Sequence, residues 1–275
     1  MKKIWLLMLT ILTLVWVNFS QAANPSQLSY QIYTQPGTKI HTLLIPGNSI
    51  FAINTAISPK LDTLSNFAAK YQGISVLNGG YFDPKNHQTT SYIVQNGELV
   101  ANPEDNERLI NNPDLTLYLK KILNRSEFRR YQCGNTRRYD ITLHQQPPPA
   151  GCVIVAALGG GPQLLPEITA EAEGFVDSEK GRDAIGSNQP NARSALGITK
   201  EGDIIWVMAE QKPLGVTLAE LAAFFSTLGV EKAINLDGGS SSAFYYQGKT
   251  YYGKIDEEGN PVQRPVKSVL LIVDS

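Results

Sequence analysis

Apolar residues in this chain gather in short runs separated by glycine, proline and polar residues, a pattern typical of a strand-rich protein. The first runs lie at residues 30–33, 40–45 and 50–57 and predict a β-meander, in which consecutive strands pair. Further strands are predicted at residues 74–77, 153–158, 194–198, 204–209, 233–236, 244–246 and 266–273. Residues 200–203 predict the turn that pairs the strands on either side of them.

Two segments have helical spacing instead. Leu61, Leu64 and Phe67 lie on one face of a predicted helix, and Gly73 follows its end. Thr217 has Glu220 three residues after it, which is the capping box that begins a helix. Together these elements predict an α+β fold, a mixed strand-rich sheet with flanking helices, in a single domain at residues 24–275.

Residues 102–152 differ in character and are interpreted as an elaboration of that domain. They carry six arginines, several proline-containing turns and one predicted helix at residues 113–123. The basic cluster is interpreted as a solvated, salt-bridged surface, with an anionic partner as the alternative.

The first 23 residues predict a secretory signal peptide. Lys2 and Lys3 precede an apolar run at residues 4–19, and small residues follow where a signal peptidase cuts. We therefore expect export to the periplasm or the extracellular space, with no stable membrane insertion after cleavage. A single transmembrane anchor is the alternative, although the run is short for a full span.

Export decides how the two cysteines are read. Cys133 and Cys152 both follow the signal, so in an oxidising compartment they predict one disulfide that closes the elaboration. A catalytic cysteine is the alternative, but neither residue has a histidine-rich neighbourhood.

Charge limits the choice of partner. The 24 basic and 25 acidic residues leave a formal net charge of −1, and removing the two lysines of the signal leaves 22 basic side chains against 25 acidic. Because no basic excess is present to neutralise phosphates, the composition argues against nucleic acid and favours a small molecule or a glycan.

Glycine clusters follow three predicted apolar strands, at residues 78–80, 159–161 and 237–239. Glycine permits close approach to the main chain, and consecutive N–H groups in such turns hold anions, so we expect the three loops to form one anion-binding pocket. Three tight turns are the alternative. The spacing fits neither a Walker A loop nor a dinucleotide-binding loop.

Charged residues at strand ends are the candidate chemical groups. Asp237 follows a buried strand and suits acid–base or nucleophilic chemistry, unless it only caps its own turn. Arg193 begins a strand and suits bidentate binding of phosphate or carboxylate, with a surface ion pair as the alternative. Glu210 follows a strand and is a possible second carboxylate, or an exposed strand end.

The chain shows no metal-ligand spacing among its three histidines, and no Gly-x-Ser-x-Gly motif of a serine hydrolase. We expect no cofactor, while a calcium ion held by carbonyls and carboxylates stays open.

Five segments, in this order, resemble the phosphodiester glycosidase family: Asn78-Gly79-Gly80-Tyr81-Phe82, Gly159-Gly160-Gly161-Pro162-Gln163-Leu164-Leu165, Ala192-Arg193-Ser194-Ala195-Leu196-Gly197-Ile198, Gly215-Val216-Thr217-Leu218-Ala219-Glu220-Leu221 and Asn235-Leu236-Asp237-Gly238-Gly239-Ser240-Ser241-Ser242. The resemblance implies hydrolysis of a sugar that is joined through its anomeric carbon to a phosphodiester, which releases free sugar and a phosphomonoester. It implies catalytic roles for Asp237 and Arg193, with Glu210 as a possible second carboxylate.

The resemblance also implies a set of substrate-binding residues, which are Asn78, Gly79, Gly80, Tyr81, Gly160, Arg193, Gly238, Gly239, Ser240, Ser241 and Arg264. The chain departs from the family's pattern at Glu210-Gln211-Lys212, where many members have Asp-Gly-Arg, and in the length of residues 102–150. Two other functions stay open: a non-catalytic module that binds anionic glycans, and a metal-dependent phosphodiesterase that cuts the P–O bond.

Overall fold

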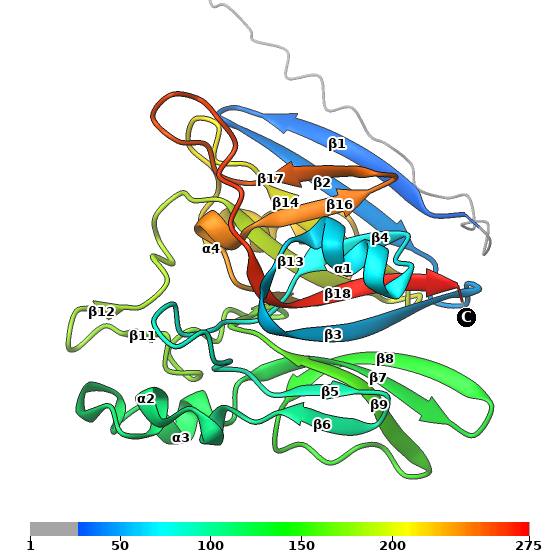
Figure 1. The fold of residues 1–275 in the computed structure, drawn as a ribbon, viewed down its shortest axis with the longest axis horizontal. Helices are drawn as coiled ribbons and strands as arrows, with labels where there is room; N and C mark the ends of the chain where they lie inside the picture. Colours follow the sequence, from blue (N-terminus) through cyan, green and yellow to red (C-terminus); the bar gives the residue numbers. More distant parts are fainter. Residues whose placement is uncertain (1–26, 275) are drawn as a thin grey trace, which may run out of the picture.

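Three β-sheets surround one central core in the computed structural model, which describes residues 27–274 (Figure 1). The predicted signal peptide lies outside the described residues. The first sheet has the strand order β1 (Ser29–Gln35), β2 (Thr38–Ile45), β14 (Ile204–Ala209), β13 (Arg193–Thr199), β15 (Val230–Asn235) and β10 (Gln163–Leu165). The second has the order β17 (Lys249–Tyr252), β16 (Ala243–Tyr246), β4 (Ser75–Asn78), β18 (Val266–Asp274) and β3 (Phe51–Asp62). The third has the order β6 (Glu98–Ala101), β5 (Ile93–Gln95), β9 (Cys152–Gly159), β7 (Ser126–Cys133) and β8 (Thr136–Leu143).

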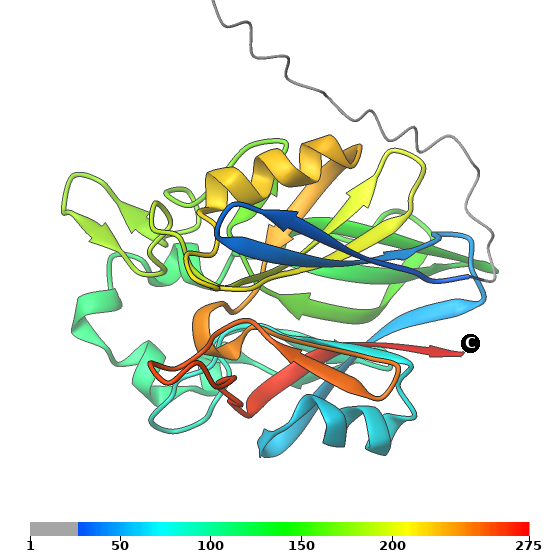
Figure 2. The ribbon, with the colours of Figure 1, turned by 90° about the horizontal axis from the view of Figure 1, so that it is seen from above.

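The first two sheets lie face to face, and each is covered by a helix on its outer side (Figure 2). Helix α4 (Leu218–Thr227) packs Leu221 and Phe225 on the first sheet, and α1 (Leu64–Tyr71) packs Phe67 on the second. All three sheets contribute to the core between them, including the fully buried Trp206 and Phe128. The predicted strand-rich α+β fold in a single domain is confirmed, with three large sheets and a two-stranded ribbon in place of one sheet.

Local sequence signals fix several of these elements. The capping box at Thr217 is present: its side chain accepts from the Glu220 N–H at 3.1 Å, and the Glu220 carboxylate accepts from the Thr217 N–H at 2.8 Å. Strands β13 and β14 pair around the predicted turn, with Ile198 opposite Ile204. These signals work because both partners of each contact lie close in sequence.

Two predictions about local structure are wrong. Strands β1 and β2 form a hairpin, but β3 pairs with β18 in the second sheet, so the β-meander ends after two strands. The predicted helix at residues 113–123 is a 3₁₀ turn, η2 (Pro113–Leu115), followed by the one-turn helix α3 (Leu119–Ile122). Between them Leu117 is 71% exposed, so no continuous apolar face exists to hold one helix against the core.

The segment interpreted as an elaboration supplies most of the third sheet and closes one side of the core with Phe128 and Ile141. The predicted disulfide is present, because Cys133 on β7 and Cys152 on β9 stand opposite each other and are bonded. The short helices η1 (Pro103–Asp105), α2 (Glu107–Ile110) and α3 lie at one end of the sheets, near the ribbon of β11 (Val176–Asp177) and β12 (Arg182–Asp183) (Figure 1). None of the described helices has the length and apolar character needed to cross a bilayer.

Candidate active site

The three predicted glycine loops meet at one end of the sheets. The Asp237 N–H donates to the Gly79 carbonyl at 3.2 Å, and the Gly161 N–H donates to the Asn235 carbonyl at 2.8 Å. The buried side chain of Asn78 donates to the Asp237 carbonyl at 2.7 Å and accepts from the Ala243 N–H at 3.1 Å. Strands β4, β9 and β15, one from each sheet, therefore deliver their ends to a common point.

The glycines at this point serve close packing, which corrects the expectation that their amides form the anion pocket. A Cβ atom on Gly80 would clash with the Gly159 carbonyl, and one on Gly160 would lie 2.8 Å from the Asn235 carbonyl. Most of the glycine N–H groups are already bonded to backbone carbonyls, namely those of Gly79, Gly159, Gly160, Gly161 and Gly239. An anion here must therefore be held mainly by side chains.

Asp237 lies at the centre of this junction, directly after β15. Burial raises the pKa of its carboxyl to about 6, against the opposing effects of the Ser241 hydroxyl, the Arg264 charge and the Gly238 N–H. Ser241 belongs to the 3₁₀ turn η3 (Gly239–Ser241) and is 1% exposed. A carboxyl with a pKa near 6 changes its protonation state within the range where enzymes use acids and bases.

Tyr81 lies beside Asp237 in a closed hydrogen-bond network. Its hydroxyl donates to the Gly161 carbonyl at 2.8 Å and accepts from the Asn235 side-chain amide at 2.8 Å. Burial and the neighbouring Asp237 carboxylate raise the pKa of Tyr81, so this residue stays neutral. Asn235 was not among the predicted site residues, although it stands in the motif that contains Asp237; its buried Oδ1 has no hydrogen-bond partner among the described residues.

Arg264 is the arginine that acts on Asp237. Its Nη1 donates to the Ser240 hydroxyl at 2.8 Å, and its guanidinium lies 5.0 Å from the centre of the Phe82 ring. Its positive charge lowers the pKa of Asp237, against the larger effect of burial. Ser240 and Arg264 thus form the cationic side of the junction.

Arg193 is 2% exposed and has another set of contacts. It donates to four backbone carbonyls, which are those of Val216 at 3.3 Å, Ile185 at 3.0 Å, Gly186 at 2.6 Å and Gln189 at 3.0 Å. Burial lowers the pKa of its guanidinium. Arg193 forms no ion pair with a described residue, which argues against the alternative of a surface ion pair. Most of the donors needed for bidentate binding of substrate are used to hold the loop at residues 185–189.

Arg125 is a candidate that the sequence did not single out. Its guanidinium stacks 3.5 Å from the centre of the Phe175 ring, and its Nε donates to the Glu173 carbonyl at 3.1 Å. It lines a crevice with Gly159 and Gly160, and burial lowers its pKa to about 10. The only sequence signal was its place in the basic cluster, because Phe175, its stacking partner, lies 50 residues away in the chain.

Comparison with known proteins identifies the family to which this chain belongs. The sequence profile of the phosphodiester glycosidase family matches residues 71–273, which include every segment of the junction. The chain belongs to the phosphodiester glycosidase family. A search among curated proteins found no match.

Solved structures of low sequence identity share the fold of this phosphodiester glycosidase family member. One is the catalytic domain of zebrafish N-acetylglucosamine-1-phosphodiester alpha-N-acetylglucosaminidase, described as auto-inhibited by its pro-peptide, with 20% identity and a TM-score of 0.68 over 90% of this chain and 83% of that one. Another is a hypothetical protein from Synechocystis, with 15% identity and a TM-score of 0.61 over 89% of this chain. The present chain spans 62% of the length of the Synechocystis protein.

Glu210, the predicted second carboxylate, has a different neighbourhood from Asp237. Its Oε1 lies 2.7 Å from Nε2 of the buried His41, whose Nδ1 lies 2.7 Å from the Tyr30 hydroxyl. The hydrogen bond from His41 lowers the pKa of Glu210. Glu210 is not among the groups that shift the pKa of Asp237, so a catalytic role for it stays a prediction.

Among residues 27–274, no group of three or more His, Cys, Asp and Glu side chains is placed to hold a metal ion. The cysteines are bonded to each other. The charged side chains at the junction include Asp237, Arg264, Arg193 and Arg125. The buried Glu173 also lies there, and its carboxylate accepts from the Gln163 N–H at 2.9 Å.

Proposed function

We propose that this protein is an exported hydrolase that cleaves the glycosidic bond of a sugar-1-phosphodiester and releases free sugar and a phosphomonoester. The observation that carries the proposal is Asp237, a carboxyl of raised pKa at the junction of three loops, with Arg264 acting on it and Arg125 and Arg193 acting on the adjacent Tyr81. Family membership supports the reaction class. The sequence of residues 1–23 supports export.

The charges suggest which role each side chain has in the reaction. Arg264 and Arg125 would hold the phosphate oxygens, because guanidinium groups match phosphate geometry and their charge offsets the charge of the leaving phosphate. Asp237 would act on the side of the anomeric carbon in its ionised form and take a proton from water. The water oxygen bonds to the anomeric carbon, the bond from that carbon to the phosphate oxygen breaks, and its electron pair leaves with the phosphomonoester.

Neutral groups would position the sugar. Tyr81 stays protonated, and the unpartnered Oδ1 of Asn235 is an acceptor that suits a sugar hydroxyl. Arg193 would support this arrangement mainly through the loop that it holds, with one Nη1 hydrogen left for substrate.

Hydrolysis of a sugar-1-phosphodiester in ¹⁸O-labelled water tests the proposal. Attack at the anomeric carbon places the label in the free sugar, whereas a phosphodiesterase places it in the phosphate. Label in the phosphate, together with loss of activity in chelator, would identify the metal-dependent phosphodiesterase. Binding without turnover across a panel of sugar phosphodiesters would identify the glycan-binding module.

A further inference from the structure

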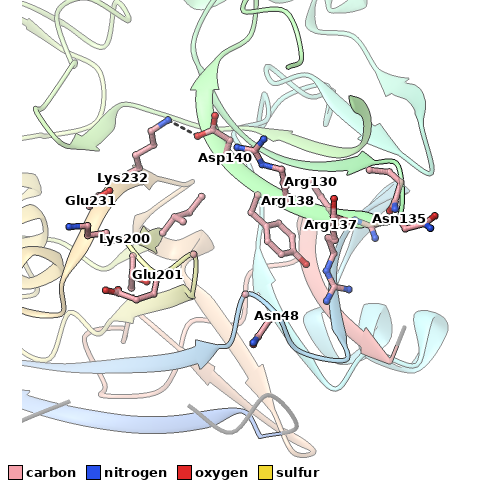
Figure 3. A pocket seen from close by; sticks show the side chains of 17 residues that line it. Asn48, Arg130, Asn135, Arg137, Arg138, Asp140, Lys200, Glu201, Glu231 and Lys232 are labelled. Carbon is pink, nitrogen blue, oxygen red and sulfur yellow. Dashed lines mark hydrogen bonds and ion pairs between the residues drawn. The ribbon is translucent and has the colours of Figure 1, made fainter. Parts of the chain in front are cut away.

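Figure 3 shows a pocket of about 930 Å³. Its residues Glu231 and Lys232 begin β15, so it lies at the end of the sheets opposite Asp237. It opens between the β7–β8 hairpin and the turn from β13 to β14, and Glu231 and Lys232 at the start of β15 complete its wall. Asp237 follows the other end of β15. Six residues of extended chain separate the two regions by roughly 20 Å, so this pocket is separate from the candidate active site.

The wall formed by the β7–β8 hairpin changes from apolar to cationic along one face. Phe128 on β7 stands opposite Ile141 on β8, and both belong to the central core. Residues two apart on a strand point to the same side. The next pairs on this face are Arg130 with Tyr139 and Gln132 with Arg137, and all four line the pocket.

The two arginines of this wall lack partners for part of their donors. Nε of Arg130 and Nε of Arg137 are buried without a hydrogen-bond acceptor among the described residues. Arg137 donates through Nη2 to the Ser49 carbonyl. Burial lowers the pKa of the Arg130 guanidinium, and the like charge of Arg137 lowers it further. Two neighbouring cations with unused buried donors are stabilised by an anion that accepts from both.

The three carboxylates that line the pocket, Asp140, Glu201 and Glu231, form no ion pair with Arg130 or Arg137. Asp140 is bonded to Lys232 at 2.6 Å, and neither Glu201 nor Glu231 forms an ion pair with a described residue. The lining residues include five cations against these three carboxylates, namely Arg130, Arg137, Arg138, Lys200 and Lys232. The pocket therefore has an excess of two positive charges, although the whole chain has a net charge of −1.

We infer that this pocket binds a phosphate-bearing glycan, with the phosphate on Arg130 and Arg137. Asn48, Asn135 and Thr136 also line the pocket and supply amide and hydroxyl groups of the kind that bind sugar hydroxyls. A volume of this size accommodates more than one sugar unit. One part of this inference rests on the proposed function, namely that the glycan in the pocket belongs to the substrate molecule that is hydrolysed. A chain of sugar phosphates could reach both the pocket and Asp237.

The experiment is a titration followed by the side-chain Nε–Hε resonances of Arg130 and Arg137. The ligands are inorganic phosphate, a phosphate-bearing oligosaccharide, a uronate-bearing oligosaccharide and a neutral oligosaccharide of equal length. We expect both resonances to shift when phosphate is added. We also expect the phosphate-bearing oligosaccharide to bind more tightly than phosphate. The titration uses Asp237→Asn protein, so binding is measured without turnover and its failure is distinct from a failure of hydrolysis.

A charge-matched pair of variants completes the test. Arg130→Gln should weaken binding of the phosphate-bearing oligosaccharide about tenfold, because a hydrogen bond to a charged group is lost. Lys60→Gln removes one exposed charge elsewhere and should leave binding unchanged. Since Nε of Arg130 bonds to no protein acceptor, Arg130→Gln should keep the melting temperature of the parent. Equal binding by Arg130→Gln and Lys60→Gln overturns the inference, as does equal or tighter binding of the neutral or uronate-bearing ligand.

Discussion

Both ends of the sheets keep buried polar atoms without a partner among the described residues. These atoms are neutral oxygens at the Asp237 end, such as Oδ1 of Asn235, and arginine nitrogens at the other end. At the Asp237 end, the side chains of Asn78 and Arg193 are bonded to backbone groups, and most glycine amides are bonded too. At the other end, Arg130 and Arg137 keep buried donors without acceptors. The bonds at the first end hold the loops around Asp237, the candidate catalytic carboxyl, and the second end leaves positive charge for a ligand to neutralise.

The largest expected effect is at Asp237. Asp237→Asn should lower kcat/KM by roughly 10²- to 10⁴-fold, the range for loss of a positioned acid or base. Its raised pKa means that the folded state favours the protonated form. The stability that this gives is greatest below the ordinary carboxyl pKa of 3.8 and is lost as the pH rises through about 6. The variant should therefore be at least as stable as the parent at pH 7, by thermal denaturation.

The pH profile of the parent checks the same residue. If ionised Asp237 takes the proton from water, kcat/KM should rise with pH through an apparent pKa of about 6. Asp114→Asn changes an exposed carboxylate and serves as the control. Full activity in Asp237→Asn would remove Asp237 from the mechanism.

Two of the three arginines at this end, Arg193 and Arg264, should separate stability from activity. Arg193→Lys leaves several buried carbonyls without donors and should lower the free energy of unfolding by about 2–4 kcal/mol. Arg264→Lys breaks one side-chain contact and should mainly raise KM, with little change in denaturant midpoint. The reverse pattern would show that Arg193 is the main phosphate ligand and Arg264 a structural residue.

A smaller loss of stability is expected from the glycine packing. Gly80→Ala forces a methyl group against the Gly159 carbonyl and should cost about 1–3 kcal/mol in urea denaturation. Gly73→Ala is the matched control, since its added Cβ would meet only ordinary contacts at 3.4 Å or more. An unaffected Gly80→Ala variant would show that the loops are not held by close backbone contact.

The smallest effect is expected at Glu210. Its hydrogen bond with His41 lowers its pKa. Its contribution to stability is therefore present above the ordinary glutamate pKa of 4.5 and is lost as the pH falls through the lowered folded-state pKa. Glu210→Gln should cost about 1 kcal/mol at pH 7, and activity should fall far less than in Asp237→Asn. A loss of activity as large as that of Asp237→Asn would make Glu210 the second catalytic carboxylate.

The sequence predicted those parts of the fold and site that depend on near neighbours. The capping box of Thr217 and the β13–β14 hairpin are contacts within a few residues, and the glycine clusters correctly marked strand ends that meet. The partner of β3 could not be predicted, because β18 is the last strand of the chain and pairing over that distance leaves no local signal. The same lack of a local signal explains why the sequence did not predict that the glycine amides are bonded to backbone carbonyls.

For the arginines too, the sequence showed the residue but not its contacts. Arg193 stood in a recognisable motif, yet its four carbonyl partners come from loops whose course no pattern revealed. Arg125 stood in a segment interpreted as an elaboration, and its position beside the glycine loops depends on the third sheet closing the core. Residue type at such sites is visible in the sequence, while the group that each side chain contacts is set by long-range packing.

The interlocking of the three loops also bears on how the protein folds. The bond from Asn78 to Asp237 joins residues 159 positions apart, and the bond from Asn235 to Tyr81 joins residues 154 apart. Contacts so distant in the chain form slowly, because a large loop must close before they are made. The candidate active site is thus assembled only when strands from all three sheets have docked, so regain of activity after refolding should report completion of the whole domain.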